Sequence, residues 1–255
     1  MQEYLCIVLD TLEIAARRAI IQDGGPLYHE FHADWFVKEP WNAYSSLFFF
    51  IPVVFWIWKL RGRYKENLII VALLPLLFLN GLGSTLYHAF RTEPIFLMMD
   101  WMPALFMSIT LSTYLWTRIV KKWYFGLFIV IAFYTMAILC VYLLIKYTGN
   151  DHMAPNFGYF FTGAAYITPI FIILVKTKWY RLKLVVLSFL FLGLALLCRA
   201  SDYPNPNPLP DILPQGTHFM WHVFSSFAVF TMGYYIYFIN KINLRDKSTY
   251  PRRAL

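Results

Sequence analysis

The sequence predicts an all-α polytopic membrane protein, a bundle of seven transmembrane helices. Of its 255 residues, 59% are hydrophobic and only 14% are charged, whereas roughly a quarter of a soluble domain's residues are charged. The apolar residues also occur in long blocks, and a helix that spans a bilayer needs about 20 such residues in succession. Seven blocks approach this length, at approximately 43–60, 68–90, 95–117, 123–145, 159–175, 182–198 and 216–239.

The basic residues predict the orientation of these spans. Most of the 22 lysine and arginine residues lie in alternate loops and in the C-terminal tail, and therefore on one side of the membrane. Short cytoplasmic loops of membrane proteins carry an excess of lysine and arginine, so we expect the C-terminus in the cytoplasm and the N-terminus outside. The net charge of +8 reflects this topology and contact with anionic lipids. No nucleic-acid-binding motif accompanies it.

Three regions follow one another along the chain. Residues 1–42 are expected to form an extracytoplasmic extension, in which 4–21 is amphipathic enough to form a helix. Residues 43–240 form the membrane domain, and 241–255 form a basic cytoplasmic tail. The connection 200–215 contains five prolines and no helical period, so we expect an extracytoplasmic loop there.

Five polar side chains stand at the outer ends of otherwise apolar spans. The second span ends with Ser84 and His88. The third begins with Asp100, and the seventh begins with His218 and His222. With the expected orientation, all five reach the same membrane leaflet. Ionisable side chains at membrane depth are costly and mark functional sites, and the spacing of four residues within each span places both members on one helix face.

These residue types indicate a metal site. Three imidazoles and a water molecule are a ligand set typical of catalytic zinc, so His88, His218 and His222 are candidate ligands. Asp100 is a candidate for orienting a ligand or for the base that takes a proton from the water. Ser84 is a candidate for stabilising an oxyanion, although a helical serine often bonds to its own backbone. A lone histidine at a helix end is more often structural, and it is the coincidence of two spaced pairs in one leaflet that favours a site.

At these residues the chain resembles the alkaline ceramidases and their bacterial relatives in the CREST superfamily of membrane hydrolases. Residues 39–46, EPWNAYSS, are similar to the family's Glu-x-x-Asn-x-x-Ser element at the first span. Residues 81–88, GLGSTLYH, followed by Asp100, are similar to its Gly-x-Gly-Ser-x-x-x-His…Asp element. Residues 216–222, GTHFMWH, are similar to its His-x-x-Trp-His element. The resemblance extends over roughly residues 39–239.

The resemblance implies a seven-helix bundle in which His88, His218 and His222 bind zinc, with Ser84 and Asp100 lining the site. The implied reaction is hydrolysis of a lipid amide, from ceramide to a sphingoid base and a fatty acid, with Asp100 passing a proton to the leaving amine. The implied partners are the bilayer and a membrane lipid substrate, reached from the extracytoplasmic leaflet, periplasmic or luminal.

The sequence departs from the eukaryotic ceramidases at their calcium site. That site is built from an Asp-Trp-x-Glu-x-Asn stretch well before the glutamate of the first element. Here Asp34-Trp35 lies only five residues before Glu39, and the full acidic set is missing. We therefore expect Zn²⁺, whereas Ca²⁺ is doubtful, with Asp34, Glu39 and Asn42 as weak calcium or structural candidates. The departure also leaves the ceramide substrate open.

Two other functions stay open. A lipid-responsive receptor of the adiponectin-receptor kind shares the zinc constellation, but those receptors have the opposite orientation. The outside N-terminus and the Glu-x-x-Asn element therefore favour the ceramidase branch. A transporter needs polar sites near the middle of the membrane, whereas the candidate residues of this chain gather in one leaflet.

Overall fold

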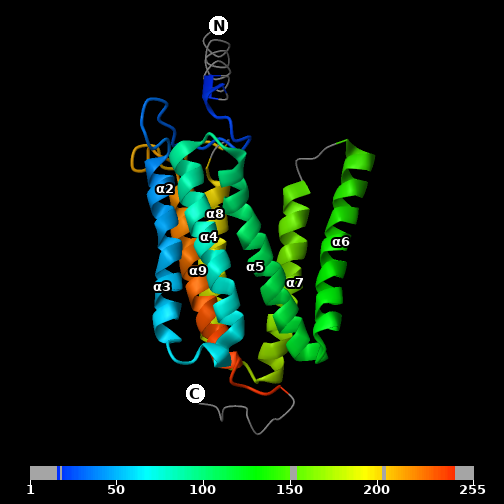
Figure 1. Cartoon of the computed structure of the whole chain (residues 1–255). Coiled ribbons are helices and arrows are strands. Elements are labelled where there is room, and N and C mark those ends of the chain that lie inside the picture. Colours follow the sequence, from blue (N-terminus) through cyan, green and yellow to red (C-terminus); the bar gives the residue numbers. More distant parts are fainter. Residues whose placement is uncertain (1–15, 18, 150–153, 203–204, 245–255) are drawn as a thin grey trace. The chain divides into compact units, whose positions relative to one another are not determined.

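The computed structural model describes residues 16–17, 19–149, 154–202 and 205–244, and in these ranges the chain forms helices and turns without any strand (Figure 1). The first long helical stretch consists of α2 (Pro40–Ser46), the 3-10 turn η1 (Leu47–Phe49) and α3 (Phe50–Lys59). It is followed by η2 (Tyr64–Asn67), α4 (Leu68–Phe90), α5 (Pro94–Val120), α6 (Trp123–Thr148), α7 (Ala154–Lys176), α8 (Leu182–Ala200) and α9 (His218–Ile239).

Six helical stretches among the described residues are long and apolar enough to cross a membrane, so the chain is a multi-pass membrane protein. They correspond to the predicted spans one to four, six and seven, and α4 has the predicted bounds of 68–90. The fifth predicted span falls on α7, whose apolar part, Phe160–Lys176, is shorter. Most of the amphipathic helix expected over 4–21, and the tail beyond residue 244, lie outside the described residues. The sides on which the two termini lie stay a prediction.

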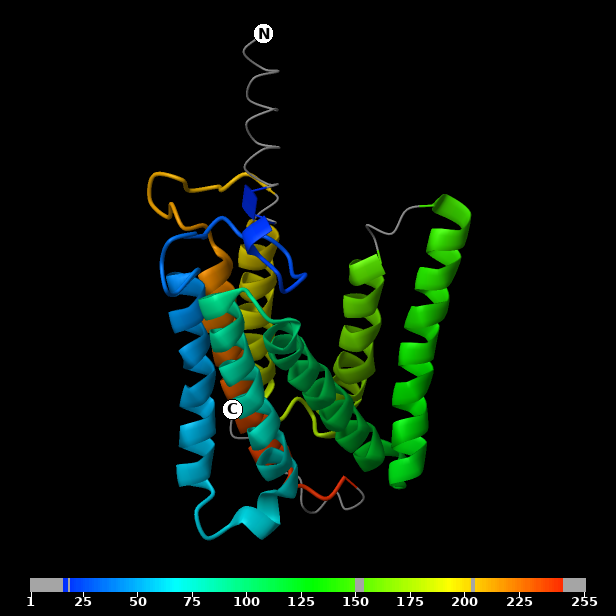
Figure 2. The ribbon, with the colours of Figure 1, turned by 45° about the horizontal axis from the view of Figure 1, so that its top comes forward.

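The helices pack into two compact units. Unit 1 contains the described parts of Met1–Gly62, Leu74–Ala104 and Val186–Gly233, and unit 2 contains those of Arg63–Leu73, Leu105–Val185 and Tyr234–Leu255. Within unit 1, α2 and α3 lie beside α4 and α9 in both views (Figures 1 and 2). Within unit 2, α6 packs along α7. All of the candidate site residues belong to unit 1.

The second and third spans approach each other closely beside the candidate residues. A methyl group placed on Gly83 of α4 would lie 2.3 Å from the backbone carbonyl carbon of Met99 in α5. Because a backbone atom cannot yield as the end of a flexible side chain can, this approach requires glycine at position 83, as expected of small residues between membrane helices. The approach brings Ser84 next to the turn of α5 that carries Asp100.

We expect the replacement of Gly83 by alanine to force α4 and α5 apart and to destabilise unit 1 by about 1–3 kcal/mol. The thermal unfolding midpoint of the detergent-purified protein measures this effect. Gly193→Ala in α8 is the matched control, because an added methyl group there meets no atom within 4 Å. The control should keep or slightly raise the midpoint. Equal midpoints for the two variants would show that the close approach is absent.

Two buried carboxylates cap the helices that begin at the candidate site. Glu30 accepts the backbone N–H groups of Trp41 and Asn42 at 2.8 and 2.9 Å, at the start of α2. Asp202 accepts those of Thr217 and His218 at 2.7 and 2.9 Å, at the start of α9. Such acceptors satisfy N–H groups that a helix start leaves unpaired, and their negative charge suits that end of the helix. Burial raises the pKa of Glu30 to about 7, although both N–H donors oppose the rise.

Candidate metal centre

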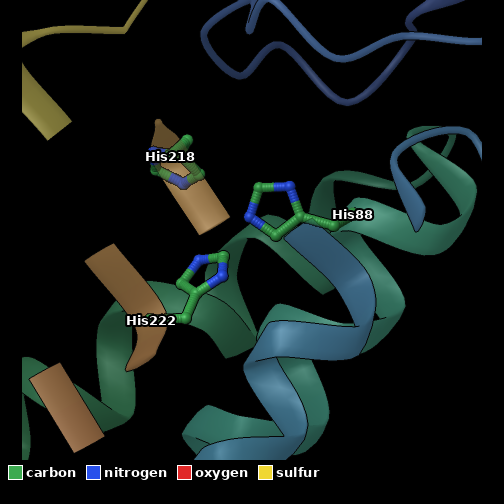
Figure 3. A group of neighbouring side chains, drawn as sticks. All are labelled: His88, His218 and His222. Atoms are coloured by element: carbon green, nitrogen blue, oxygen red, sulfur yellow. The ribbon is translucent and has the colours of Figure 1, made fainter. Parts of the chain in front are cut away.

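Three histidines converge within unit 1 from two helices. His88 comes from the last turn of α4, and His218 and His222 come from the first two turns of α9, with their rings directed toward a common space (Figure 3). One potential ligand atom of each residue lies within 4.8 Å of those of the other two. All three side chains are buried. Within the part of the chain that the structure describes, this is the one group of three or more His, Cys, Asp or Glu residues that could hold a metal ion.

The ring nitrogens of these histidines fit a metal ion. His88 uses Nδ1 to contact Glu39 Oε2 at 2.5 Å, and its buried Nε2 has no hydrogen-bond partner among the described residues. Nδ1 of His218 is also buried and has no partner there. A buried polar atom without a partner is costly and requires an explanation. A metal ion bound by three imidazole nitrogens provides one, and this donor set is one that catalytic zinc takes.

Groups around the triad orient two of the three rings. The Glu39 carboxylate lies against Nδ1 of His88. Ser45 Oγ lies 2.9 Å from Nδ1 of His222 and donates its own proton to the carbonyl oxygen of Asn42 at 3.0 Å. The serine oxygen therefore accepts from the Nδ1–H group of His222, which leaves Nε2 of that ring with its lone pair. Outer partners of this kind fix the tautomer and orientation of metal-binding histidines.

We expect Ser45→Ala to weaken zinc binding about tenfold, because removal of an outer partner of a ligand typically costs 10–100-fold in affinity. Competition with a chromophoric chelator measures the dissociation constant. Ser225→Ala is the matched control, since Ser225 is also a buried serine of unit 1 but its hydroxyl has no hydrogen-bond partner among the described residues. An unchanged zinc affinity in the Ser45 variant would show that Ser45 does not support metal binding.

A chain of hydroxyl groups connects the triad to Asp100. Ser46 Oγ lies 3.3 Å from Nδ1 of His222 and 3.0 Å from Ser84 Oγ, and it also hydrogen-bonds the carbonyl oxygen of Asn42 at 2.9 Å. The Ser84 hydroxyl in turn lies close enough to the carboxylate of Asp100 to interact with it. Asn80 donates from its side chain to the backbone oxygen of Asp100. Ser84 is fully buried and the Asp100 residue is half-buried, and the Asp100 carboxylate stands at the end of this polar network.

The weak calcium candidates do not gather into one site. Glu39 is buried, and Asn42 donates to its Oε2 from Nδ2 at 3.3 Å. Asp34 is exposed in a turn. The cation that faces Glu39 is the guanidinium of Arg91. Among the described residues, no group of three acidic side chains has the geometry of a metal site.

Sequence reasoning missed the charged residues that support the site. They lie in connecting segments, where a charged side chain is normally solvated, and only their distant partners in the fold bury them. One signal was present for Arg91, which is one of the few basic residues expected on the outer side and follows His88 by three positions. The missed residues are Arg91 and Asp202, whereas the sequence suggests Asp23 and Glu30 only as contributors to a calcium site and not in their observed roles.

Neither a protein-family model nor a curated protein sequence matches this chain. A function is therefore inferred from the three motifs and from the geometry of the buried triad. The geometry supports a metal centre directly, whereas the resemblance to the alkaline ceramidases stays a hypothesis.

Proposed function

We propose that this protein is a zinc-dependent hydrolase within a membrane, which cleaves the amide bond of a lipid. The buried triad of histidines carries this proposal, because two of the rings present unpartnered nitrogens on helices that are apolar enough to span a membrane. Zinc in such a site supplies Lewis-acid activation of water and of a carbonyl oxygen. The residues around the triad supply the proton transfers and orientation that amide hydrolysis also requires.

Asp100 is the group that moves the proton. Its carboxylate takes a proton from the water that attacks the carbonyl carbon, and returns it to the nitrogen of the leaving amine as the carbon–nitrogen bond breaks. A general base must come within hydrogen-bond distance of the proton that it takes, and Asp100 lies beside Ser84, in the same polar network as His222. The interaction with Ser84 holds the carboxylate in place until the substrate arrives.

Ser84 is the hydrogen-bond donor to the substrate in this proposal. Its hydroxyl lies beside Ser46 and Asp100, and its proton turns to the carbonyl oxygen of the substrate as negative charge develops there. Donors aimed at a developing oxyanion lower the barrier more than any other single interaction in many enzymes.

The depth of the site supports a lipid amide as the substrate class. His88 lies in the last turn of α4, and His218 is the first residue of α9, so the triad lies near the level at which two membrane-spanning helices end. The amide of a ceramide lies at the same level, between the polar head group and the hydrocarbon chains. Ceramide is therefore the first substrate that we propose, in keeping with the three motifs, with its hydrolysis in the extracytoplasmic leaflet.

We expect Ser84→Ala to lower turnover about 100-fold, the lower end of the loss seen when an oxyanion donor is removed, while the zinc content stays unchanged. Thr85→Ala is the neighbouring control, because the hydroxyl of Thr85 donates to the carbonyl oxygen of Gly81 in its own helix at 2.8 Å. Wild-type turnover in the Ser84 variant would show that Ser84 has a structural role and does not stabilise the oxyanion.

The assay of the proposed activity uses the protein in lipid nanodiscs, with ceramide, an N-acylethanolamine and a diacylglycerol ester as parallel substrates. Release of the fatty acid is quantified by mass spectrometry in the zinc-loaded protein, after chelation and after zinc is restored. We expect release from ceramide that disappears on chelation and returns with zinc. Stoichiometric zinc without release from any of the three lipids would instead favour a receptor that uses the same metal centre.

A further inference from the structure

Residues 21–38 form a strap without helical structure, the N-terminal strap, which lies against the end of unit 1 where α2 and α9 begin (Figure 2). Its two ends are fixed to the last turn of α4 and to the residue that follows this helix. The N–H group of Gln22 donates to the carbonyl oxygen of Arg91 at 3.2 Å, and that of Lys38 donates to the carbonyl oxygen of Ala89 at 2.8 Å. Between these points the strap buries Asp23, Gly25, Leu27, Tyr28 and Glu30.

A buried guanidinium links the strap to the triad. Nε of Arg91 donates to Asp23 at 2.7 Å, Nη1 donates to Oε1 of Glu39, and Nη2 donates to the carbonyl oxygen of Pro26 at 2.8 Å. The other oxygen of Glu39, Oε2, contacts Nδ1 of His88. One carboxylate therefore bridges the guanidinium and the imidazole. Because Arg91 binds Oε1 of Glu39, Oε2 is the oxygen that contacts His88.

The charged side chains that link the strap to His88 are deeply buried and depend on one another. The side chains of Asp23, Glu39 and His88 are fully inaccessible, and that of Arg91 is 1% exposed. Burial alone would lower the pKa of Arg91, but the carboxylates of Glu39 and Asp23 raise it above its ordinary value, so the guanidinium stays charged. A buried ion whose partner is removed is strongly destabilised, so each group holds the next in place.

The strap also contacts the triad directly. The ring of Tyr28 lies 4.1 Å from that of His218 and 5.1 Å from that of His88, measured between centroids. The N–H group of His29 donates to Asp202 at 3.1 Å, and Asp202 also accepts the N–H group of His218. Two of the three candidate ligands are thus covered or oriented by residues of the strap.

We propose that docking of the N-terminal strap is coupled to metal binding. Asp23 and Arg91 act as positioning residues that hold Glu39 against His88. This inference rests on the proposed metal site. Coupling between two equilibria is reciprocal. Loosening the strap must weaken metal binding, and metal binding must by the same factor stabilise the docked strap.

The test measures the zinc affinity of Asp23→Asn by competition with a chromophoric chelator. This variant keeps the shape of the side chain but removes the charge that faces Arg91. We expect its dissociation constant to rise about tenfold, the lower end of the range for outer partners of metal ligands. Val53→Ala is the control, because Val53 is buried in α3 of the same unit and is not part of the strap. This control should lower the unfolding midpoint without changing the zinc affinity.

A second variant changes no charge. A methyl group on Gly25 would lie 2.2 Å from the hydroxyl oxygen of Tyr87, so Gly25→Ala should loosen the strap and also weaken zinc binding. Hydrogen exchange over residues 22–38 provides the reciprocal measurement, and zinc should slow this exchange in the wild type more than in either variant. Wild-type zinc affinity in both variants would overturn the coupling while leaving the metal site intact. Absence of zinc binding in the wild type would overturn the proposed function itself, and the coupling with it.

Discussion

Replacement of His222 by alanine should remove both the bound metal and the hydrolytic activity. His222 is one of three imidazoles in the triad, it is buried, and Ser45 orients its ring. Loss of a ligand should exceed the roughly 10–100-fold loss of affinity that follows removal of an outer partner. Metal analysis of the purified variant, together with a lipid amidase assay at saturating zinc, measures the two effects.

Phe219→Leu is a suitable control for His222→Ala. Phe219 follows His218 on α9, and its ring lies against that of Trp41, so the change alters packing near the site but removes no nitrogen ligand. This control should retain stoichiometric zinc. Retention of one tightly bound zinc by the His222 variant would exclude His222 as a ligand and would leave only two histidines, too few for the proposed centre.

Replacement of Asp100 by asparagine should leave most of the metal in place and lower turnover by about 10²–10⁴-fold, the usual contribution of a general base. Asparagine keeps the shape of the side chain but cannot take a proton from water. The turnover number and the zinc content of the same preparation are the required measurements. Turnover should fall without a matching loss of zinc. Asp100 lies outside the group of three ligands and is connected to it only through serine hydroxyls.

Asp211→Asn is the control for Asp100→Asn, since Asp211 is an exposed aspartate of the same unit. Its variant should match the wild type in both turnover and metal content. A similar loss of zinc and turnover in the Asp100 variant would indicate a metal ligand or an orienting group. Unchanged turnover would exclude the role of base.

The helices and the triad could be predicted because both depend on local sequence patterns. Length and apolar composition alone decide that 68–90 forms a spanning helix, and the structure has the same bounds. The spacing of four residues between His218 and His222 places both on one face of a helix, and the predicted orientation brought His88 to the same end. Their approach in the structure agrees with that reasoning.

The residues that support the triad could not be predicted, because their roles depend on contacts between distant parts of the chain. Asp23 and Arg91 lie 68 positions apart, and His29 and Asp202 lie 173 apart. Apart from the expected outer position of Arg91, three residues after His88, nothing in the local sequence distinguishes these residues from solvated polar groups of a loop. The first predicted span also began at residue 43, whereas α2 begins at Pro40. There Glu30 satisfies the N–H groups of the first turn, and a proline suits a helix start because it has no N–H group to satisfy.

The most direct test of the central claim is the metal content of the detergent-purified protein, prepared without chelators, beside the His218→Ala, His222→Ala double variant. Mass spectrometry of the metals, normalised to the protein concentration, is the measurement. The proposed centre predicts about one zinc ion per chain in the wild type and none in a folded double variant. A wild-type protein that contains no zinc and takes up none on addition would contradict the metal centre and the hydrolase built on it.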